Sequence, residues 1–146
     1  MTQPKISLQM IFNAGWQAFI IEGQAPCQTS EGCRYSLPNG TACIVGLTLP
    51  PEHPSRKFIG GFSMLVRKYP ELFDDRIVLL NETHPHKLLT FQRRLHDSLC
   101  EIKYQKLDGE YHEVGPVWKK TREEREAIYR DVAKDFSLTI PGVTND

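Results

Sequence analysis

The dipeptide Asn39-Gly40 is the feature that most constrains how this chain can fold. A two-residue type I′ turn needs positive φ at both central positions, and Asn-Gly is the pair that most readily supplies it. β-branched and aromatic residues stand on both sides of the dipeptide. We therefore predict a β-hairpin over residues 33–46 and expect it to lie at the centre of the fold.

Pairing outward from this turn divides the side chains between two faces. Tyr35 and Ile44 lie opposite each other on an apolar face that we expect to point into the core. Arg34 lies on the other, mixed face, which looks outward or toward a site. Cys33 and Cys43 fall on opposite faces, so no disulfide is expected across the hairpin.

Composition places the chain among ordinary globular proteins. Apolar residues make up 40% of the 146 residues, and 18 Lys and Arg balance 18 Asp and Glu, so nothing favours a nucleic-acid or anionic-membrane surface. No apolar run is long enough to span a membrane, and four cysteines without a secretion signal indicate reduced thiols. We expect one cytoplasmic domain over residues 1–146, frayed at 1–5 and 142–146.

Helical periodicity predicts about four helices packed on the central hairpin, which makes the fold class α+β and mostly helical. These helices begin near Ser7, Phe62, Pro85 and Thr121. The first is apolar nearly all round, which is typical of a central helix or of one that packs on a partner. Thr121 and Glu124 form a capping box.

Two further segments have weaker patterns. Residues 76–80 are predicted to form either a brief strand or a buried turn, since an apolar run this short fits both. Residues 101–114 turn at Asp108-Gly109 and are predicted to form a second, exposed hairpin.

Short motifs follow one another in a fixed order between residues 33 and 138. They are Cys33-x-Tyr35, Pro38-x-Gly40-x-x-Cys43-x-x-Gly46 and Pro50, then Phe91-Gln92-Arg93-Arg94-Leu95-His96-Asp97, Trp118 and Phe136-Ser137-Leu138. This order resembles a widespread group of small uncharacterised phage and bacterial proteins. Members of that group carry a Cys-x-Tyr-Arg-Gly-x-x-Gly-x-x-Cys-Ala-x-Gly stretch, a Leu-Gln-x-x-His-Asp helix, a tryptophan and a closing helix.

The resemblance implies descent from a mobile element and no particular chemistry. The chain departs from the group's pattern at Ser36-Leu37, where the group has Arg-Gly. Arg34 lies on the same face as Ser36 and is the candidate to replace that arginine.

A zinc site is the sharpest chemical hypothesis. Its ligands would be Cys33, Cys43 and His96, with Cys27 or Cys100 as the fourth. The spacings Cys27-x5-Cys33 and Cys33-x9-Cys43 are longer than a zinc knuckle allows, and the hairpin register separates Cys33 from Cys43. We therefore favour buried, reduced cysteines.

His96 and Gln92 lie four residues apart on one predicted helical face, with Asp97 next to the histidine. Adjacent residues on a helix do not face each other, so Asp97 is not expected to orient His96 as a general base. The basic residues between 118 and 130, including Arg125, alternate with glutamates and are predicted to form a solvated helix face.

No nucleotide-binding loop, hydrolase or metalloprotease motif is present, so we favour no enzymatic activity. The expected function is that of a phage or prophage protein that binds and modulates a host protein, such as an inhibitor of a host defence system. Nucleic acid is a disfavoured partner, and no cofactor is expected. The alternative is the zinc site, as a binding module or a metal-dependent enzyme. The partner's identity and the oligomeric state stay open. The candidate contact residues are Arg34, Tyr104, Tyr111 and Trp118.

Overall fold

The structure is a computed structural model, and it describes residues 4–26, 43–58 and 60–142. Most of this part is helical: α1 (Leu8–Gly15), α2 (Phe62–Lys68), α3 (Asp75–Thr83), α4 (Pro85–Leu95) and α5 (Arg122–Asp135). An antiparallel hairpin of β1 (Cys100–Leu107) and β2 (Glu110–Trp118) joins α4 to α5. The described chain is therefore α+β and mostly helical, which confirms the predicted fold class, with five helices where about four were expected.

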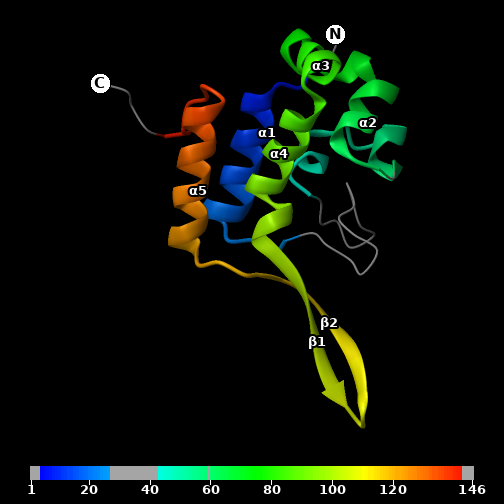
Figure 1. Cartoon of the computed structure of the whole chain (residues 1–146), viewed down its shortest axis with the longest axis vertical. Helices are drawn as coiled ribbons and strands as arrows, with labels where there is room; N and C mark the ends of the chain where they lie inside the picture. Colours follow the sequence, from blue (N-terminus) through cyan, green and yellow to red (C-terminus); the bar gives the residue numbers. More distant parts are fainter. Residues whose placement is uncertain (1–3, 27–42, 59, 143–146) are drawn as a thin grey trace.

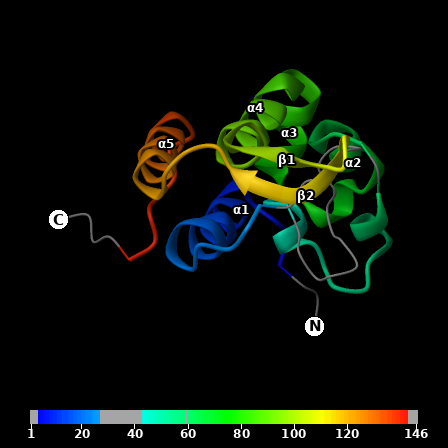
Figure 2. The same ribbon diagram turned by 90° about the horizontal axis from the view of Figure 1, so that it is seen from below.

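The helices form a body in which α4 lies between α5 and α2 (Figures 1 and 2). Short 3₁₀ segments at Gly46–Thr48, Pro54–Lys57, Pro70–Leu72 and Asp97–Leu99 connect the longer elements. Among the described residues, no helix has both the length and the apolar character needed to cross a bilayer.

The first helix buries most of its apolar side chains inside the body. The Ser7 hydroxyl accepts a hydrogen bond from the Met10 amide and caps α1, so the helix begins beside Ser7 as predicted. Beyond Gly15 the helix continues with π-helical geometry over Trp16–Ile21. The Phe12 ring packs 5.5 Å from the Tyr129 ring of α5, centroid to centroid. The chain's own elements therefore cover the buried apolar side chains of this helix, which are Leu8, Ile11, Phe12, Trp16, Ala18, Phe19 and Ile20.

The central hairpin predicted over residues 33–46 is wrong in the part that the structure describes. Residues 33–42 lie outside the described residues, but the chain from Cys43 to Thr48 forms a turn and a 3₁₀ segment instead of a strand. Three successive side chains there are at most 1% exposed, whereas a strand would place alternate ones on opposite faces. The inward position of Ile44 is confirmed, and the opposite face predicted for its two neighbours is wrong, because all three side chains are buried. The three side chains are those of Cys43, Ile44 and Val45.

Gly15 allows this segment to approach α1 closely. A Cβ atom at Gly15 would lie 2.5 Å from Ile44 Cδ1 and 2.8 Å from the Tyr129 hydroxyl. That hydroxyl donates a 2.7 Å hydrogen bond to the carbonyl of Leu95, the last residue of α4. α1, α4, α5 and the segment after Cys43 thus meet at one point in the core.

Helix α3 corrects the strand or turn predicted over residues 76–80. The Asp74 carboxylate caps the helix by accepting a 3.0 Å hydrogen bond from the Ile77 amide. Ile77 is the one fully buried side chain of α3, and Leu79 is 60% exposed. The helix therefore lacks the apolar stripe from which helices are predicted. The Asn81 side-chain amide links it to α2 by donating a 3.1 Å hydrogen bond to the Ser63 carbonyl.

Candidate functional site: the projecting hairpin

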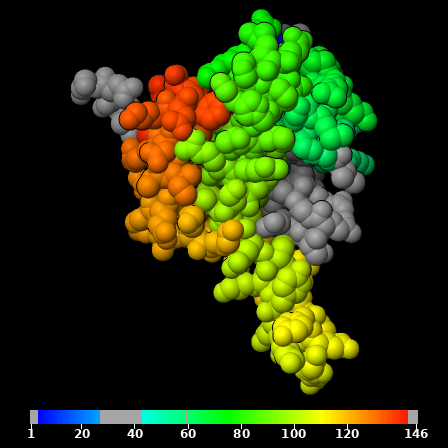
Figure 3. Space-filling view, in the orientation of Figure 1, coloured from blue at the N-terminus to red at the C-terminus, as the bar shows by residue number. Residues whose placement is uncertain are grey.

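The second hairpin extends away from the helical body as a narrow projection (Figures 1 and 3). We call residues 101–117 the arm. The turn predicted at its end is formed, with φ of +52° at Asp108 and +82° at Gly109. Positive φ at both central positions is the type I′ geometry that matches the twist of the two strands. The sequence prediction of an exposed hairpin is therefore confirmed.

A β-bulge divides the arm into two parts. Lys103 pairs with Gly115, but the next residue, Tyr104, pairs with Glu113, which leaves Val114 as the extra residue of β2. Gly115 has φ of +110°, a conformation that side chains disfavour, so glycine suits this side of the bulge. We call residues 104–114 the arm tip. Every residue of the arm tip is exposed, whereas residues 115–118 are partly buried.

One face of the arm tip carries both predicted tyrosines. Tyr104 lies opposite Glu113, and Lys106 lies opposite Tyr111, so these four side chains point to the same side of the ribbon. We call this side the tyrosine face. Tyr104 is 54% exposed and Tyr111 is 72% exposed. The Lys106 ammonium lies 5.8 Å from the centre of the Tyr111 ring, within reach of a cation–π interaction.

The other face of the arm tip is also uncovered by described residues. Its members, by the same register, are Gln105, Leu107, Glu110 and His112. A two-stranded ribbon that buries neither face gains little stability from its own packing. Exposed apolar and aromatic side chains gathered on such an element are typical of an interaction site.

Trp118 anchors the arm to the body. Its ring lies 5.3 Å from the Phe19 ring and 5.7 Å from the His96 ring, centroid to centroid, and it is partly buried. The indole Nε1 donates a 3.0 Å hydrogen bond to the Gln24 carbonyl. Of the candidate contact residues, Tyr104 and Tyr111 therefore share an exposed face, and Trp118 lies at the root of the arm instead.

Arg125 of α5 also lies at the root of the arm, by which we mean Trp118 and the residues that contact it. The prediction that Arg125 is solvated is wrong. Its side chain is only 6% exposed, and its two terminal nitrogens donate hydrogen bonds to the carbonyls of Lys120 (2.9 Å) and Phe19 (3.2 Å). Its Nε has no hydrogen-bonding partner among the described residues, and burial lowers the pKa of the guanidinium. Arg125 is placed four residues before Tyr129 and seven before Val132, so it belongs to the buried stripe of α5. That spacing is the sequence signal that could have identified it.

His96 is fully buried between the Phe19 and Trp118 rings. Its Nδ1 lies 2.9 Å from Asp97 Oδ1, so the prediction that Asp97 does not orient His96 is wrong. The reason is that α4 ends at Leu95. His96 has φ of −149° and ψ of −66°, which is not helical, and the changed chain direction brings the two adjacent side chains together.

The cysteines that the structure describes are buried thiols. Cys43 and Cys100 are both buried, whereas Cys27, Cys33 and Arg34 lie outside the described residues. Within residues 4–26, 43–58 and 60–142, no three His, Cys, Asp or Glu side chains are grouped closely enough to hold a metal ion. The proposed zinc site requires Cys33 and stays a hypothesis.

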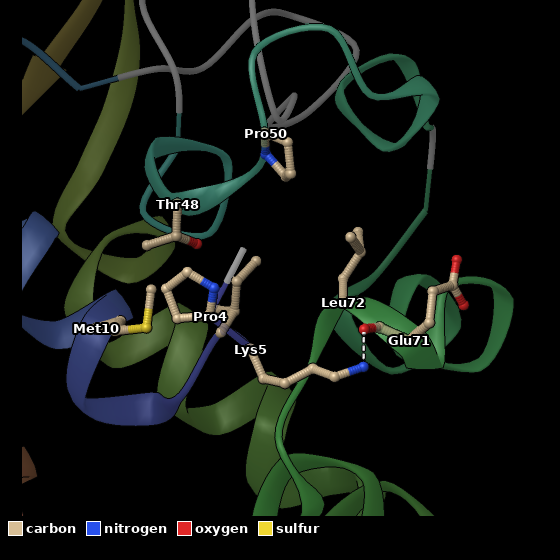
Figure 4. A pocket seen from close by; sticks show the side chains of 8 residues that line it. Pro4, Lys5, Met10, Thr48, Pro50, Glu71 and Leu72 are labelled. Carbon is tan, nitrogen blue, oxygen red and sulfur yellow. Dashed lines mark hydrogen bonds between the residues drawn. The ribbon is translucent and has the colours of Figure 1, made fainter. Parts of the chain in front are cut away.

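A cleft of about 280 Å³ opens between the N-terminal segment and the 3₁₀ segments of the body (Figure 4). Its one amino group, Lys5 Nζ, donates a hydrogen bond to the backbone carbonyl of Glu71 (Figure 4). The lining residues include no histidine, cysteine or aspartate, and the polar side chains among them are those of Lys5, Thr48 and Glu71. The lining residues are Pro4, Lys5, Ile6, Met10, Thr48, Pro50, Glu71 and Leu72.

Comparison of the chain with protein-family models, with curated proteins and with solved structures found no match in any of the three. The geometry of the arm and its root is thus the basis for assigning a function. That geometry is typical of an interaction protein, because exposed rings are held on a projecting ribbon whose base is fixed in the core.

Proposed function

We propose that this chain acts by binding another protein, and that the arm is its contact element. The observation that carries the proposal is the exposure of Tyr104 and Tyr111 on the same face of a ribbon that has no core beneath it. Tyrosine is enriched at protein interfaces because it offers a large contact area for few rotatable bonds. Burying these two rings against a partner would remove much of the arm's exposed aromatic surface from water.

The charge of the arm favours a protein over a nucleic acid. Residues 101–117 contain two lysines and four acidic residues, which gives a net charge of −2, counting His112 as neutral. Nucleic-acid binding depends on cations that neutralise phosphates. An acidic arm would repel a phosphate backbone, whereas protein surfaces carry both signs of charge. The charged residues are Lys103, Lys106, Glu101, Asp108, Glu110 and Glu113.

The root of the arm supports the same reading. Trp118 contacts Phe19, His96 and Arg125, so the strands leave the body from a packed base. An element that is already oriented loses less conformational entropy when it binds. The arm therefore presents its tyrosines in a defined direction from the body.

The order of motifs along the chain supports a phage or prophage origin. On that basis we propose that the partner is a host protein in the cytoplasm and that binding modulates its activity, with inhibition of a host defence system as the working case. No cofactor takes part in this proposal, because contact alone is sufficient for it.

Photo-crosslinking in bacterial cells tests the proposal. Benzoylphenylalanine replaces Tyr111 in the full chain, and a matched variant carries it at Leu79, an exposed position of the body. We expect a covalent adduct with a distinct second protein from position 111 and none from position 79. Adducts that are the same from both positions, or that contain nucleic acid, would contradict the proposal.

A further inference from the structure

We propose that the tyrosine face also pairs with the tyrosine face of a second copy of this chain. This inference goes beyond the proposed function, because the occupant is the same chain rather than a different protein. A second copy and another protein would compete for Tyr104 and Tyr111, yet each can be tested without the other.

The four side chains of the tyrosine face occupy the corners of a near-rectangle. Tyr104 and Lys106 are two residues apart on β1, and Glu113 and Tyr111 lie opposite them on β2. The two tyrosines therefore share one diagonal, and Lys106 and Glu113 share the other. This arrangement places one cation and one anion symmetrically about a line of aromatic rings.

A twofold axis along the tyrosine diagonal makes this face complementary to itself. When two such faces meet about that axis, each Tyr ring lies against its own counterpart, and Lys106 of each copy lies against Glu113 of the other. The pair gains two intermolecular ion pairs and aromatic contacts, with the strands of the two arms crossing steeply as in orthogonal sheet packing. An axis along the other diagonal would set lysine against lysine and glutamate against glutamate, so charge selects the first arrangement.

The charges needed for this pairing are available. Neither Lys106 nor Glu113 makes an ion pair with another residue of the described chain. On the body, by contrast, Arg130 pairs with Glu126 at 2.9 Å. The opposite face of the arm tip lacks this complementarity, because its Glu110 has no lysine or arginine beside it on that face. Self-pairing is therefore specific to the tyrosine face.

The contact is small, so the association is weak. Stable interfaces bury about 1,200–2,000 Å² in total, and four side chains on each copy supply less than that. We expect a dissociation constant on the order of 0.1 mM, with arms paired only at high local concentration.

Charge exchange between copies tests this arrangement. Sedimentation equilibrium of the full chain from about 10 µM to about 1 mM is expected to show the average mass rising from that of a monomer toward that of a dimer. The variants Lys106→Glu and Glu113→Lys each set like charges together, so each alone is expected to associate at least about tenfold more weakly. An equimolar mixture of the two variants restores both ion pairs and is expected to associate as the unchanged chain does. Circular dichroism confirms that each variant is folded.

The variant Glu110→Lys, on the opposite face, is the matched control and should self-associate normally. A chain that stays monomeric throughout the range overturns the inference, and so does a mixture that associates no better than its separate components. Either result leaves the proposed function standing, because the adduct formed from position 111 with a different protein reports on that function alone.

Discussion

The guanidinium carbon of Arg125 lies 4.7 Å from the centre of the Trp118 ring, so one contact joins the end of β2 to the start of α5. The same guanidinium bonds the carbonyls of Lys120 and Phe19. Arg125 therefore links the π-helical end of the first helix, the strand-to-helix connection and α5. Two carbonyl oxygens and an aromatic face surround this buried cation, and they offset part of its desolvation cost.

A double-mutant cycle on Arg125 and Trp118 measures this coupling. Trp118→Ala removes the partly buried ring and is expected to lower the free energy of unfolding by about 2–3 kcal/mol. Arg125→Ala leaves two carbonyls without their donor, at a cost of about 2–3 kcal/mol. The unfolding free energy of the double variant should fall by about 1 kcal/mol less than the sum of the two single losses. The reason is that both single variants remove the same cation–π contact, which the double variant removes only once.

Urea unfolding gives these values, and Arg122→Ala on the exposed side of α5 serves as the control, with an expected change within about 0.5 kcal/mol. Strict additivity of the two substitutions would show that the guanidinium and the ring do not interact energetically.

Gly15→Ala is expected to destabilise the core by about 2 kcal/mol or more, because the new methyl would lie 2.5 Å from Ile44 Cδ1. Adding Ile44→Val removes the Cδ1 methyl group of Ile44 and should recover part of the lost stability. The Tyr129 hydroxyl, 2.8 Å from the new methyl, still crowds the site. Thermal unfolding of the single and double variants measures the recovery. Asn13→Ala, exposed on the same helix, is the control and should change stability little. If Gly15→Ala is as stable as the unchanged chain, the close approach of Ile44 to α1 is wrong.

Local signals in the sequence predicted the parts of the fold that neighbouring residues determine. The capping box is formed as predicted, with the Glu124 amide donating to Thr121 Oγ and the Thr121 amide donating to Glu124 Oε1. The Asp108-Gly109 turn is also formed, because its conformation depends on the two residues themselves. From that turn the sequence located the exposed hairpin that now carries Tyr104 and Tyr111.

Tertiary packing decided the parts that were predicted wrongly. The β-branched residues after Cys43 suit a strand, yet they form a turn in which consecutive side chains are buried, with Ile44 against Gly15 of α1. The charge of Arg125 predicts a solvated side chain, whereas its spacing from Tyr129 and Val132 predicts the buried stripe of α5, where it lies. The arm's tyrosines share a face because the two-residue turn pairs Lys106 with Tyr111 and Tyr104 with Glu113. The bulge at Val114, which the sequence pattern does not reveal, changes the register only between the arm tip and the rest of the arm.

Tyr129 should make stability fall at alkaline pH. Burial raises the pKa of its hydroxyl far above the usual value of about 10, so the folded chain keeps the proton where the unfolded chain releases it. The hydroxyl's contribution is complete below about pH 10 and is lost as the pH rises above that value. Tyr129→Phe is expected to cost about 1–2 kcal/mol at neutral pH, since the Leu95 carbonyl loses its donor, and to flatten the alkaline decline.

Urea unfolding between about pH 8 and about pH 11 measures how steeply the free energy of unfolding falls with pH in the unchanged chain and in the Tyr129→Phe chain. Tyr111→Phe removes an exposed hydroxyl and should leave the slope unchanged. An equally steep decline in the Tyr129→Phe chain would mean that other groups cause it.

Shortening the arm should separate binding from folding. In the variant, Lys103 is joined to Gly115 through Asp108-Gly109 alone, which removes the rest of the arm tip and keeps the root at Trp118. Because no side chain of the arm tip is buried, the free energy of unfolding is expected to change by less than about 1 kcal/mol. Crosslinking to a partner protein, followed from a benzoylphenylalanine placed at Lys103 in both chains, should fall to background in the shortened one. The double variant Tyr104→Ala/Tyr111→Ala keeps the ribbon and should lose most of the same signal, because the rings supply most of the contact area. A shortened chain that still forms the adduct would move the binding site from the arm tip to the body, and one that unfolds would show that the tip stabilises the helices.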